Sequence, residues 1–330
     1  RITQAFENRI EAKSLPGVVI RVARQGKLVY SNAIGWQDIE SNIPMSQDSI
    51  FRIYSMTKPI ISVAAMTLVE SGMLSLSDPV SKYLPLFKEV QVGIETVNSD
   101  GLALLQTKKA RKQITIQDLM RHTSGLTYGP FGKKTLVKEK YLAANLRSLD
   151  WTLEDYVNTL AGLPLAYEPG STWDYGRSTD VLGRVIEVIS GMTLDRYLSK
   201  TIFTPLGMRD TSFGVPESKH HRVAENMTDI ATGEKIELID VKKPMTLFAG
   251  GHGLSSTADD YIRFCQMMLN GGELDGIRIL SPKIVLFMST NHINENISKG
   301  RLYLPGPGYG FGLGFATRLE DGQSVWPGSV

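Results

Sequence analysis

The sequence has almost no cysteine. Cys265 is the only one in 330 residues, so a disulfide within the chain is excluded, and cysteine usage leaves the redox compartment open. Cys265 lies in the apolar, helix-like stretch "YIRFCQMML", where we expect a small residue of the core rather than a nucleophile.

The chain also lacks a strong excess of charge of either sign. Its formal net charge is +2 at neutral pH, and it has no basic stripe of the kind that binds nucleic acid. The short basic cluster "KKARK" (108 to 112) fits a solvated loop. We therefore expect no nucleic-acid partner.

Long apolar runs are missing as well. No run approaches the ~18 residues of a transmembrane helix, so we expect no membrane span. No signal-peptide pattern opens the chain, which favours a cytoplasmic protein. The first residue, however, is Arg1 and not Met, so we take the start to be trimmed, and an exported precursor stays open.

Strand-like patterns lie at both ends of the chain. The stretch "GVVIRVARQGKLVYSNAIGW" (17 to 36) predicts a hairpin, because two β-branched runs flank a turn at Gln25-Gly26. Near the other end, "GYGFGLGFATRL" (308 to 319) predicts a strand over which another segment or a substrate passes closely. Its glycine spacing also matches a dinucleotide-binding loop, but no hydrophobic strand precedes it and no helix follows.

Helical patterns fill the middle of the chain. The first, "PIISVAAMTLVESG" (59 to 72), is apolar on nearly every side and ends at a glycine. Another strong helix is predicted for "DVLGRVIEVISG" (180 to 191). Threonines placed three residues before an aspartate mark further helix starts, at Thr115, Thr152 and Thr257.

The length allows one large domain or two. Because the β-rich ends enclose a helical middle, we predict an α/β domain made of residues 1–60 and 246–330. A mainly helical domain, residues 61–245, would be inserted into it. The fold class is thus α/β plus all-α.

Several motifs that would indicate other chemistries are absent. The pattern His-Glu-x-x-His does not occur, and the histidines lack helical spacing with carboxylates, so we expect no metal site. Neither the nucleophile elbow Gly-x-Ser-x-Gly nor a Walker phosphate loop is present. The chain has five histidines: His122, His220, His221, His252 and His292.

A serine and a lysine stand three residues apart in "RIYSMTKPII" (52 to 61). On a helix, Ser55 and Lys58 would share one face, and the lysine would lean back toward the serine. Burial would lower the pKa of the lysine, so a partly neutral amine would lie beside a nucleophile. The alternative is a helix-capping serine followed by a lysine that reaches water along an apolar surface.

Two further stretches bear on this choice. Tyr175, in "EPGSTWDYGRSTDVLG" (168 to 183), lies in a turn-rich segment before a helix. It is either an ordinary aromatic residue or a second proton carrier. His122, in "DLMRHTSGL" (118 to 126), could be catalytic, but a structural role at the end of a helix is the better interpretation.

Taken in order, these stretches resemble the serine β-lactamase and penicillin-binding-protein superfamily, and within it the class C β-lactamase-like family VIII carboxylesterases. The resemblance also runs through "PGVVIRVARQGKLVY", "PLGMRDTSF", "GGHGLSSTADDYIRF" and "GYGFGLGF", and so spans almost the whole chain. It implies a β-lactamase/transpeptidase-like fold, in which an antiparallel sheet flanked by helices carries a helical insertion domain.

The resemblance also implies a mechanism. Ser55 would be acylated, Lys58 and Tyr175 would transfer protons, and the Ser55 backbone N–H would be one oxyanion donor. No cofactor and no metal are implied. The partner would be a small-molecule ester, while the oligomeric state stays open.

Two departures from the family pattern matter. β-Lactamases usually have Tyr-x-Asn where this chain has Arg177 in the third position, which favours an esterase. The third family motif, Lys-Thr-Gly or often Trp-Gly-Gly, is expected after "SVWPGSV" (324 to 330), so the second oxyanion donor is expected beyond Val330. "GGHG" (250 to 253) has similar letters but lies too early to be that motif.

Three functions remain open at this point. The first is a serine esterase, the second a β-lactamase or D-amino-acid peptidase, and the third a binding protein whose site has decayed. The segments 86–112 and 127–150 are long and irregular, so we expect them to shape the pocket entrance. Tyr128 and Phe131 are the candidate pocket walls, with Arg177 as a further substrate contact.

Overall fold

The computed structural model describes residues 1–146, 150–229 and 232–323. The chain forms two compact units. Unit 1 consists of Arg1–Tyr54, Ser199–Met245 and Gly253–Ile279, and unit 2 of Ser55–Leu198, Thr246–His252 and Leu280–Val330. These ranges follow packing, whereas the ranges predicted from sequence follow changes in secondary structure; the predicted domain boundaries stay a prediction.

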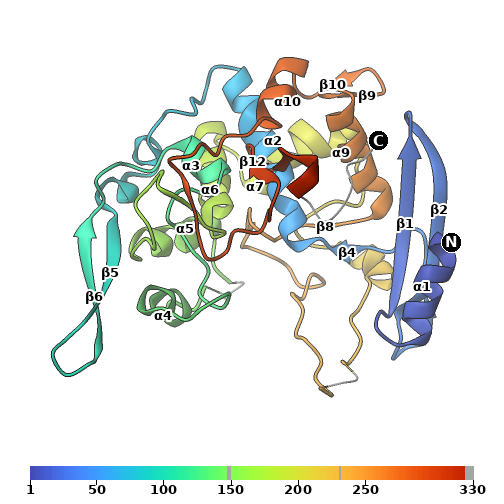
Figure 1. Cartoon of the computed structure of the whole chain (residues 1–330). Coiled ribbons are helices and arrows are strands. Elements are labelled where there is room, and N and C mark those ends of the chain that lie inside the picture. Colours follow the sequence, from blue (N-terminus) through green and yellow to red (C-terminus); the bar gives the residue numbers. More distant parts are fainter. Residues whose placement is uncertain (147–149, 230–231, 324–330) are drawn as a thin grey trace. The chain divides into compact units, whose positions relative to one another are not determined.

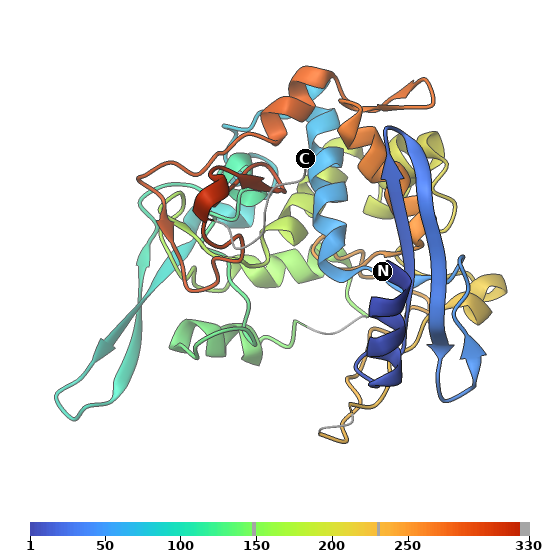
Figure 2. The ribbon, with the colours of Figure 1, turned by 45° about the vertical axis from the view of Figure 1, so that its right-hand side comes forward.

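The first sheet of unit 1 is antiparallel, in the order β1-β2-β3. Strands β1 (Gly17–Arg24) and β2 (Lys27–Asp38) form the predicted hairpin, and β3 (Ile43–Pro44) pairs with β2. Gln25 and Gly26 both have positive φ, 51° and 72°, as a tight turn between twisted strands requires. Helix α1 (Ile2–Glu11) lies along β1 and β2 (Figures 1 and 2).

Helix α9 (Ala258–Leu269) packs against β1 in the same unit. Its buried residues are Asp260, Phe264 and Met267, which lie on one face. Cys265 lies on the other side of the helix and is exposed. The prediction that Cys265 is a core residue is therefore wrong, because the stretch is one-sided and not apolar all round.

A small cluster of aliphatic side chains forms another core in unit 1: Ile50, Val215, Val223 and Val241. The remaining elements of this unit are short: β4 (Phe51–Arg52), η4 (Ser199–Phe203), α8 (Thr204–Leu206), η5 (Glu217–Arg222), β8 (Ser255–Ser256), β9 (Glu273–Leu274) and β10 (Ile277–Arg278). Strand β4 pairs with β8, and β9 pairs with β10.

Unit 2 is built around two buried helices, α2 (Thr57–Glu70) and α6 (Ser178–Ser190), which pack on each other. Ten of the 14 residues of α2 are buried, as its apolar sequence predicts. Both helices end as expected, since Gly72 and Gly191 adopt left-handed φ of 75° and 66°. Helices α3 (Ile116–Met120) and α5 (Leu153–Ala161) also pack on α6.

The predicted threonine caps are present. Thr115 and Thr152 each form a complete capping box with the aspartate three residues on. Thr257 also accepts the N–H of Asp260. The Asp260 carboxylate, however, accepts hydrogen bonds from the backbone N–H of Asp210 and the hydroxyl of Thr211, so it ties α9 to the segment that follows α8.

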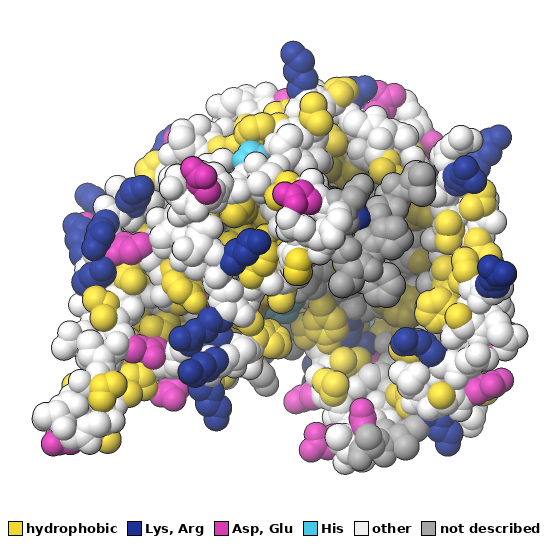
Figure 3. Space-filling view, in the orientation of Figure 1, with side chains coloured by type: hydrophobic (Ala, Val, Ile, Leu, Met, Phe, Trp, Pro, Cys, Tyr) yellow, Lys and Arg dark blue, Asp and Glu magenta, His cyan; other side chains and the backbone are white. Residues whose placement is uncertain are grey.

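The segment 86–112 is not an irregular loop. It contains a regular antiparallel hairpin, β5 (Gln91–Val97) with β6 (Ala103–Lys109), preceded by the turn η3 (Pro85–Glu89). The hairpin projects from the helices of its unit (Figure 1). Basic side chains gather near its base (Figure 3). Lys108 and Lys109 of the "KKARK" cluster are the last two residues of β6, so this part of the cluster lies on a strand and not in a loop.

The glycine-rich stretch 308–319 is likewise two strands and not one: β12 (Tyr309–Phe311) turns at Gly314 and pairs with β13 (Ala316–Arg318). The predicted close approach is confirmed. A Cβ on Gly312 would lie 2.1 Å from the carbonyl oxygen of Met288.

The other elements of unit 2 complete the chain: η1 (Tyr54–Met56, of which Tyr54 belongs to unit 1), η2 (Val80–Lys82), α4 (Leu136–Ala143), β7 (Thr172–Trp173), α7 (Leu194–Leu198), α10 (Pro282–Met288), β11 (Ser298–Lys299) and η6 (Asp321–Gln323). None of the helices in the described part of the chain combines the length and apolar character that crossing a bilayer requires.

Candidate active site

Ser55 lies in the 3-10 turn η1, directly before α2, and not inside the α-helix as the sequence suggested. The residue as a whole is exposed. The preceding residue, Tyr54, has φ of 43°, a left-handed conformation that is unfavourable for a bulky side chain. Such strain is typical of functional positions that the surrounding structure holds in place.

Lys58 points back to Ser55, as the three-residue spacing predicts. Its Nζ lies 3.3 Å from Ser55 Oγ, 3.2 Å from the Tyr128 hydroxyl and 2.6 Å from the carbonyl oxygen of Gly251. The residue is only 5% exposed. The interpretation of a lysine that reaches water is therefore wrong, because three protein oxygens surround the amine.

The buried position of Lys58 changes its proton affinity. Desolvation lowers the pKa of the ammonium from 10.5 to about 8, with Arg177 lowering it further and Asp180 opposing the shift. Lysine pKa values of this kind are typical of amines that act as bases near neutral pH.

Tyr175 lies between β7 and α6, with its ring 4.7 Å from Lys58 Nζ. Burial raises the pKa of its hydroxyl above 10, although hydrogen bonding with Ser55 opposes the rise. The structure therefore brings together all three residues predicted to be catalytic, within unit 2.

His122 supports the tyrosine and does not reach the serine. Its buried ring packs 5.0 Å from the Tyr175 ring and 5.6 Å from that of Trp173, measured between centroids. Burial lowers the pKa of the imidazole to about 3, so the ring is neutral. Its φ of 58° and its carbonyl, which accepts the N–H of Asp174, fit the predicted structural role.

The three candidate substrate contacts differ in position. Tyr128 is buried and hydrogen-bonds Lys58, so it belongs to the environment of the amine. Phe131 is 55% exposed, and its ring lies 5.4 Å from that of Tyr128. Arg177 places its guanidinium carbon 4.4 Å from the centroid of the Tyr128 ring.

The sequence analysis did not predict the buried hydrogen bonds that connect Lys58 through Gly251 to Asp180. The carbonyl of Gly251 accepts from Lys58, while the N–H of Gly251 donates to Asp180 Oδ1 at 2.8 Å. A Cβ at position 251 would lie 2.8 Å from the other carboxylate oxygen of Asp180, so the close approach requires glycine. The two glycines before His252 could have indicated a close approach of the backbone to another group. The sequence does not show that this group is Lys58, because only the folded chain brings the two segments together.

The Ser55 N–H is available as a donor. No hydrogen bond joins it to another residue of the described ranges. The segment 324–330, "SVWPGSV", lies outside the described residues. The second oxyanion donor, expected after it, therefore stays an expectation.

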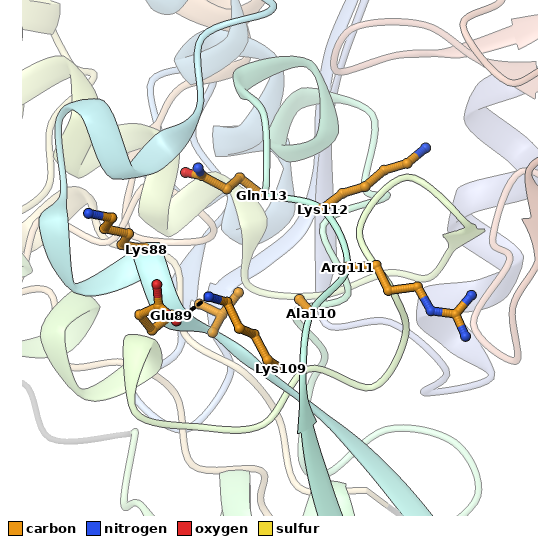
Figure 4. A pocket seen from close by; sticks show the side chains of 8 residues that line it. Lys88, Glu89, Lys109, Ala110, Arg111, Lys112 and Gln113 are labelled. Atoms are coloured by element: carbon orange, nitrogen blue, oxygen red, sulfur yellow. Dashed lines mark ion pairs between the residues drawn. The ribbon is translucent and has the colours of Figure 1, made fainter.

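A cavity of about 320 Å³ occurs elsewhere in unit 2, between η3 and the base of β6. It is lined by basic residues, but Lys109 is paired with Glu89 at 2.7 Å, and Arg111 and Lys112 extend away from each other (Figure 4). None of the predicted catalytic residues lines it. Within the described ranges, no three His, Cys, Asp or Glu side chains are grouped as metal ligands would be.

Comparison with known sequences decides the family, because a sequence model described as Beta-lactamase matches residues 2–328. The chain belongs to the β-lactamase family. An uncharacterised protein of Mycobacterium tuberculosis is 35% identical over 321 residues, which are 95% of this chain and 78% of the relative. Esterase EstB of Burkholderia gladioli is 29% identical over 339 residues, 97% of this chain and 80% of EstB.

The solved structure of EstCE1, described as a hydrolase with promiscuous acyltransferase activity, has a TM-score of 0.81 at 27% identity, covering 99% of this chain and 84% of EstCE1. The predicted β-lactamase/transpeptidase-like fold is thus confirmed. These relatives support a hydrolase or acyltransferase of the family, with a small-molecule substrate.

Proposed function

We propose that this protein is a carboxylesterase that hydrolyses small esters through an acyl group carried on Ser55. The observation that carries the proposal is the contact between Lys58 Nζ and Ser55 Oγ, 3.3 Å, made by an amine whose pKa is lowered to about 8. A serine hydroxyl becomes a useful nucleophile when an adjacent base takes its proton.

Lys58 is the better candidate for that base. An unprotonated amine has two N–H donors and one lone pair. The carbonyl of Gly251 and the hydroxyl of Tyr128 can take the two donors, which leaves the lone pair for Ser55. Tyr175, with its pKa raised above 10, stays protonated near neutral pH and suits proton donation.

Acylation would then run in two steps. Ser55 Oγ attacks the ester carbonyl carbon while its proton passes to Lys58, and the carbonyl oxygen becomes an oxyanion facing the Ser55 N–H. The C–O bond to the alcohol breaks, and Tyr175 protonates the departing oxygen, regaining its own proton from Lys58.

Hydrolysis of the acyl-enzyme repeats the pattern with water. Lys58 takes a proton as the water oxygen attacks the acyl carbon, and that proton passes to Ser55 Oγ as its bond to the acyl carbon breaks and the acid leaves. An alcohol in place of water would give acyl transfer instead. That second activity is favoured by the likeness to EstCE1, whose description includes acyltransferase activity.

The test is replacement of the nucleophile. Ser55→Ala should lower the rate of release from a chromogenic short-chain ester by at least about a thousandfold, because nucleophile and base act as one unit. The wild-type protein should gain the mass of one fluorophosphonate adduct on Ser55, and the variant none. Undiminished ester turnover by Ser55→Ala would refute the mechanism, and a wild type without any adduct would favour the decayed binding protein.

The β-lactamase alternative is tested in the same experiment. A chromogenic cephalosporin assayed beside the ester compares the two substrate classes on one protein sample. We expect the ester to be preferred, because Arg177 stands where β-lactamases usually have asparagine.

A further inference from the structure

Arg177 is an unusual arginine. It is only 9% exposed, and its Nε is buried without a hydrogen-bond partner. Within residues 1–146, 150–229 and 232–323, no hydrogen bond or ion pair engages its guanidinium group. Its contacts there are with aromatic faces, 4.4 Å from the Tyr128 ring and 5.7 Å from the Tyr156 ring.

This arrangement is energetically incomplete. A guanidinium group stays charged in proteins and carries five N–H donors in a planar fork. Burying a charge is costly unless it is paired and hydrogen-bonded. Contacts with aromatic faces supply part of the missing interaction, but they use the face of the guanidinium plane and leave the donors along its edge without acceptors.

The position of Arg177 links this edge to the catalytic group. Its guanidinium carbon lies against the ring of Tyr128, and the hydroxyl of the same ring lies 3.2 Å from Lys58 Nζ. In sequence it is two residues after Tyr175, at the start of α6. A group bound by Arg177 would therefore lie close to the acyl or the alcohol portion of an ester at Ser55.

We propose that Arg177 binds a carboxylate carried by the ester substrate, so that the preferred substrates are anionic esters. This inference rests on the proposed esterase function and names its substrate class. A carboxylate is planar and accepts two parallel N–H bonds from a guanidinium edge. Asp180 already acts on Arg177 with its negative charge. A carboxylate with one charge therefore suits the site better than a phosphate dianion, which would add a further negative charge beside an amine that must be neutral to act.

The test compares matched pairs of esters. Monoethyl succinate, glutarate and adipate carry the charge on the acyl side, and each is compared with the ester whose far carboxylate is a carboxamide. For the alcohol side, 4-(butanoyloxy)benzoate is compared with 4-(butanoyloxy)benzamide. In the wild-type protein, kcat/KM should be higher for the anionic member of at least one pair.

Arg177→Met should lower the anionic-to-neutral ratio of kcat/KM for that pair by about 10- to 100-fold, as expected for lost charge-assisted hydrogen bonds. Arg177→Lys keeps the charge but loses the fork, and should keep part of the preference. A ratio measured at one pH is insensitive to any change in Lys58, because its protonation affects both esters equally.

Arg184→Met is the matched control. Arg184 lies on the same helix, and its guanidinium is already paired with Glu154 at 2.7 Å and Glu187 at 3.1 Å. This variant removes the same charge from α6 and should leave the ratio unchanged. Thermal unfolding of each variant checks that it is folded. If Arg177→Met is not folded, the ratio of Arg177→Lys is compared with that of the wild type instead.

The outcomes separate the two proposals. Suppose that hydrolysis depends on Ser55 but the anionic-to-neutral ratio of kcat/KM is the same in the wild type and both Arg177 variants. This result leaves the esterase proposal standing and overturns the carboxylate site. An equal fall of the ratio in Arg184→Met also overturns it, because the effect would then be one of general charge. Ser55-dependent hydrolysis of the chromogenic ester without hydrolysis of any pair also overturns the carboxylate site. Absence of Ser55-dependent hydrolysis of the chromogenic ester and of every pair overturns the esterase proposal itself.

Discussion

At the scale of single residues, the environment of Lys58 dominates the proposed chemistry. The residue types and their spacing were predictable from "SMTK", because a three-residue separation places two side chains on one face of a helix. The acceptors around the amine were not. Gly251 lies 193 positions from Lys58, and Asp180 enters only because α6 packs beside α2. Long-range contacts of this kind leave no periodic pattern in one sequence.

The lowered pKa of Lys58 predicts a pH profile. For a neutral ester, kcat/KM should rise with pH to a plateau, with its midpoint near the amine pKa of about 8. Below that pH the amine is protonated and cannot accept the Ser55 proton, and above it the lone pair is free. The profile of kcat/KM reports the free enzyme. A midpoint near 10.5, the value of an ordinary lysine, would contradict a desolvated base.

Two variants test whether the charges of Asp180 and Arg177 act on the pKa of Lys58 in opposite directions. Asp180 raises the pKa of Lys58 by its negative charge, so Asp180→Asn should move the midpoint of the rising limb to lower pH. Asparagine can still accept the N–H of Gly251, so geometry is largely kept. Arg177 acts with the opposite sign, and Arg177→Met should move the same limb to higher pH. Shifts in the same direction for both variants would show that the two charges do not act on Lys58.

At the scale of elements, periodicity and caps predicted what is local. The hairpin 17–36, the buried helix α2 and the threonine caps follow from neighbouring residues. The segment 86–112 was mistaken for a loop because its strands are exposed along much of their length, so they lack the alternation of a half-buried strand. In the stretch 308–319, the turn at Gly314 divides one run of glycines into two strands.

The hairpin β12–β13 offers a test of close packing. In Gly312→Ala, the new Cβ would lie 2.1 Å from the carbonyl oxygen of Met288 and 2.8 Å from that of Thr290. Because both neighbours are backbone atoms, the strand must shift, and we expect the free energy of unfolding to fall by about 1–3 kcal/mol.

The matched control is Gly322→Ala, where a Cβ would meet no atom of residues 1–146, 150–229 and 232–323 within 4 Å. Its free energy of unfolding should change by no more than about 0.5 kcal/mol. Chemical denaturation of both variants measures the two changes. Equal stabilities would argue against the tight contact of Gly312 with the end of α10 and the residues just after it.

At the scale of the whole molecule, the order of motifs along the chain was more informative than any motif alone. A serine and a lysine three residues apart occur in many proteins, whereas seven stretches in one order predicted the family that the sequence comparison shows. Substrate class was not predictable in this way. The substrate class proposed above rests on the surroundings of Arg177, which three tyrosines and a helix end create only after folding.

The single exposed thiol of Cys265 makes this protein convenient for spectroscopy. A maleimide dye can attach at one place only, on α9 of unit 1, while a fluorophosphonate dye would mark Ser55 in unit 2. Because the fluorophosphonate occupies the nucleophile, the doubly labelled protein does not turn over. Energy transfer between the two dyes, installed without any engineered cysteine, would instead report the distance between α9 and Ser55 in the inhibited protein.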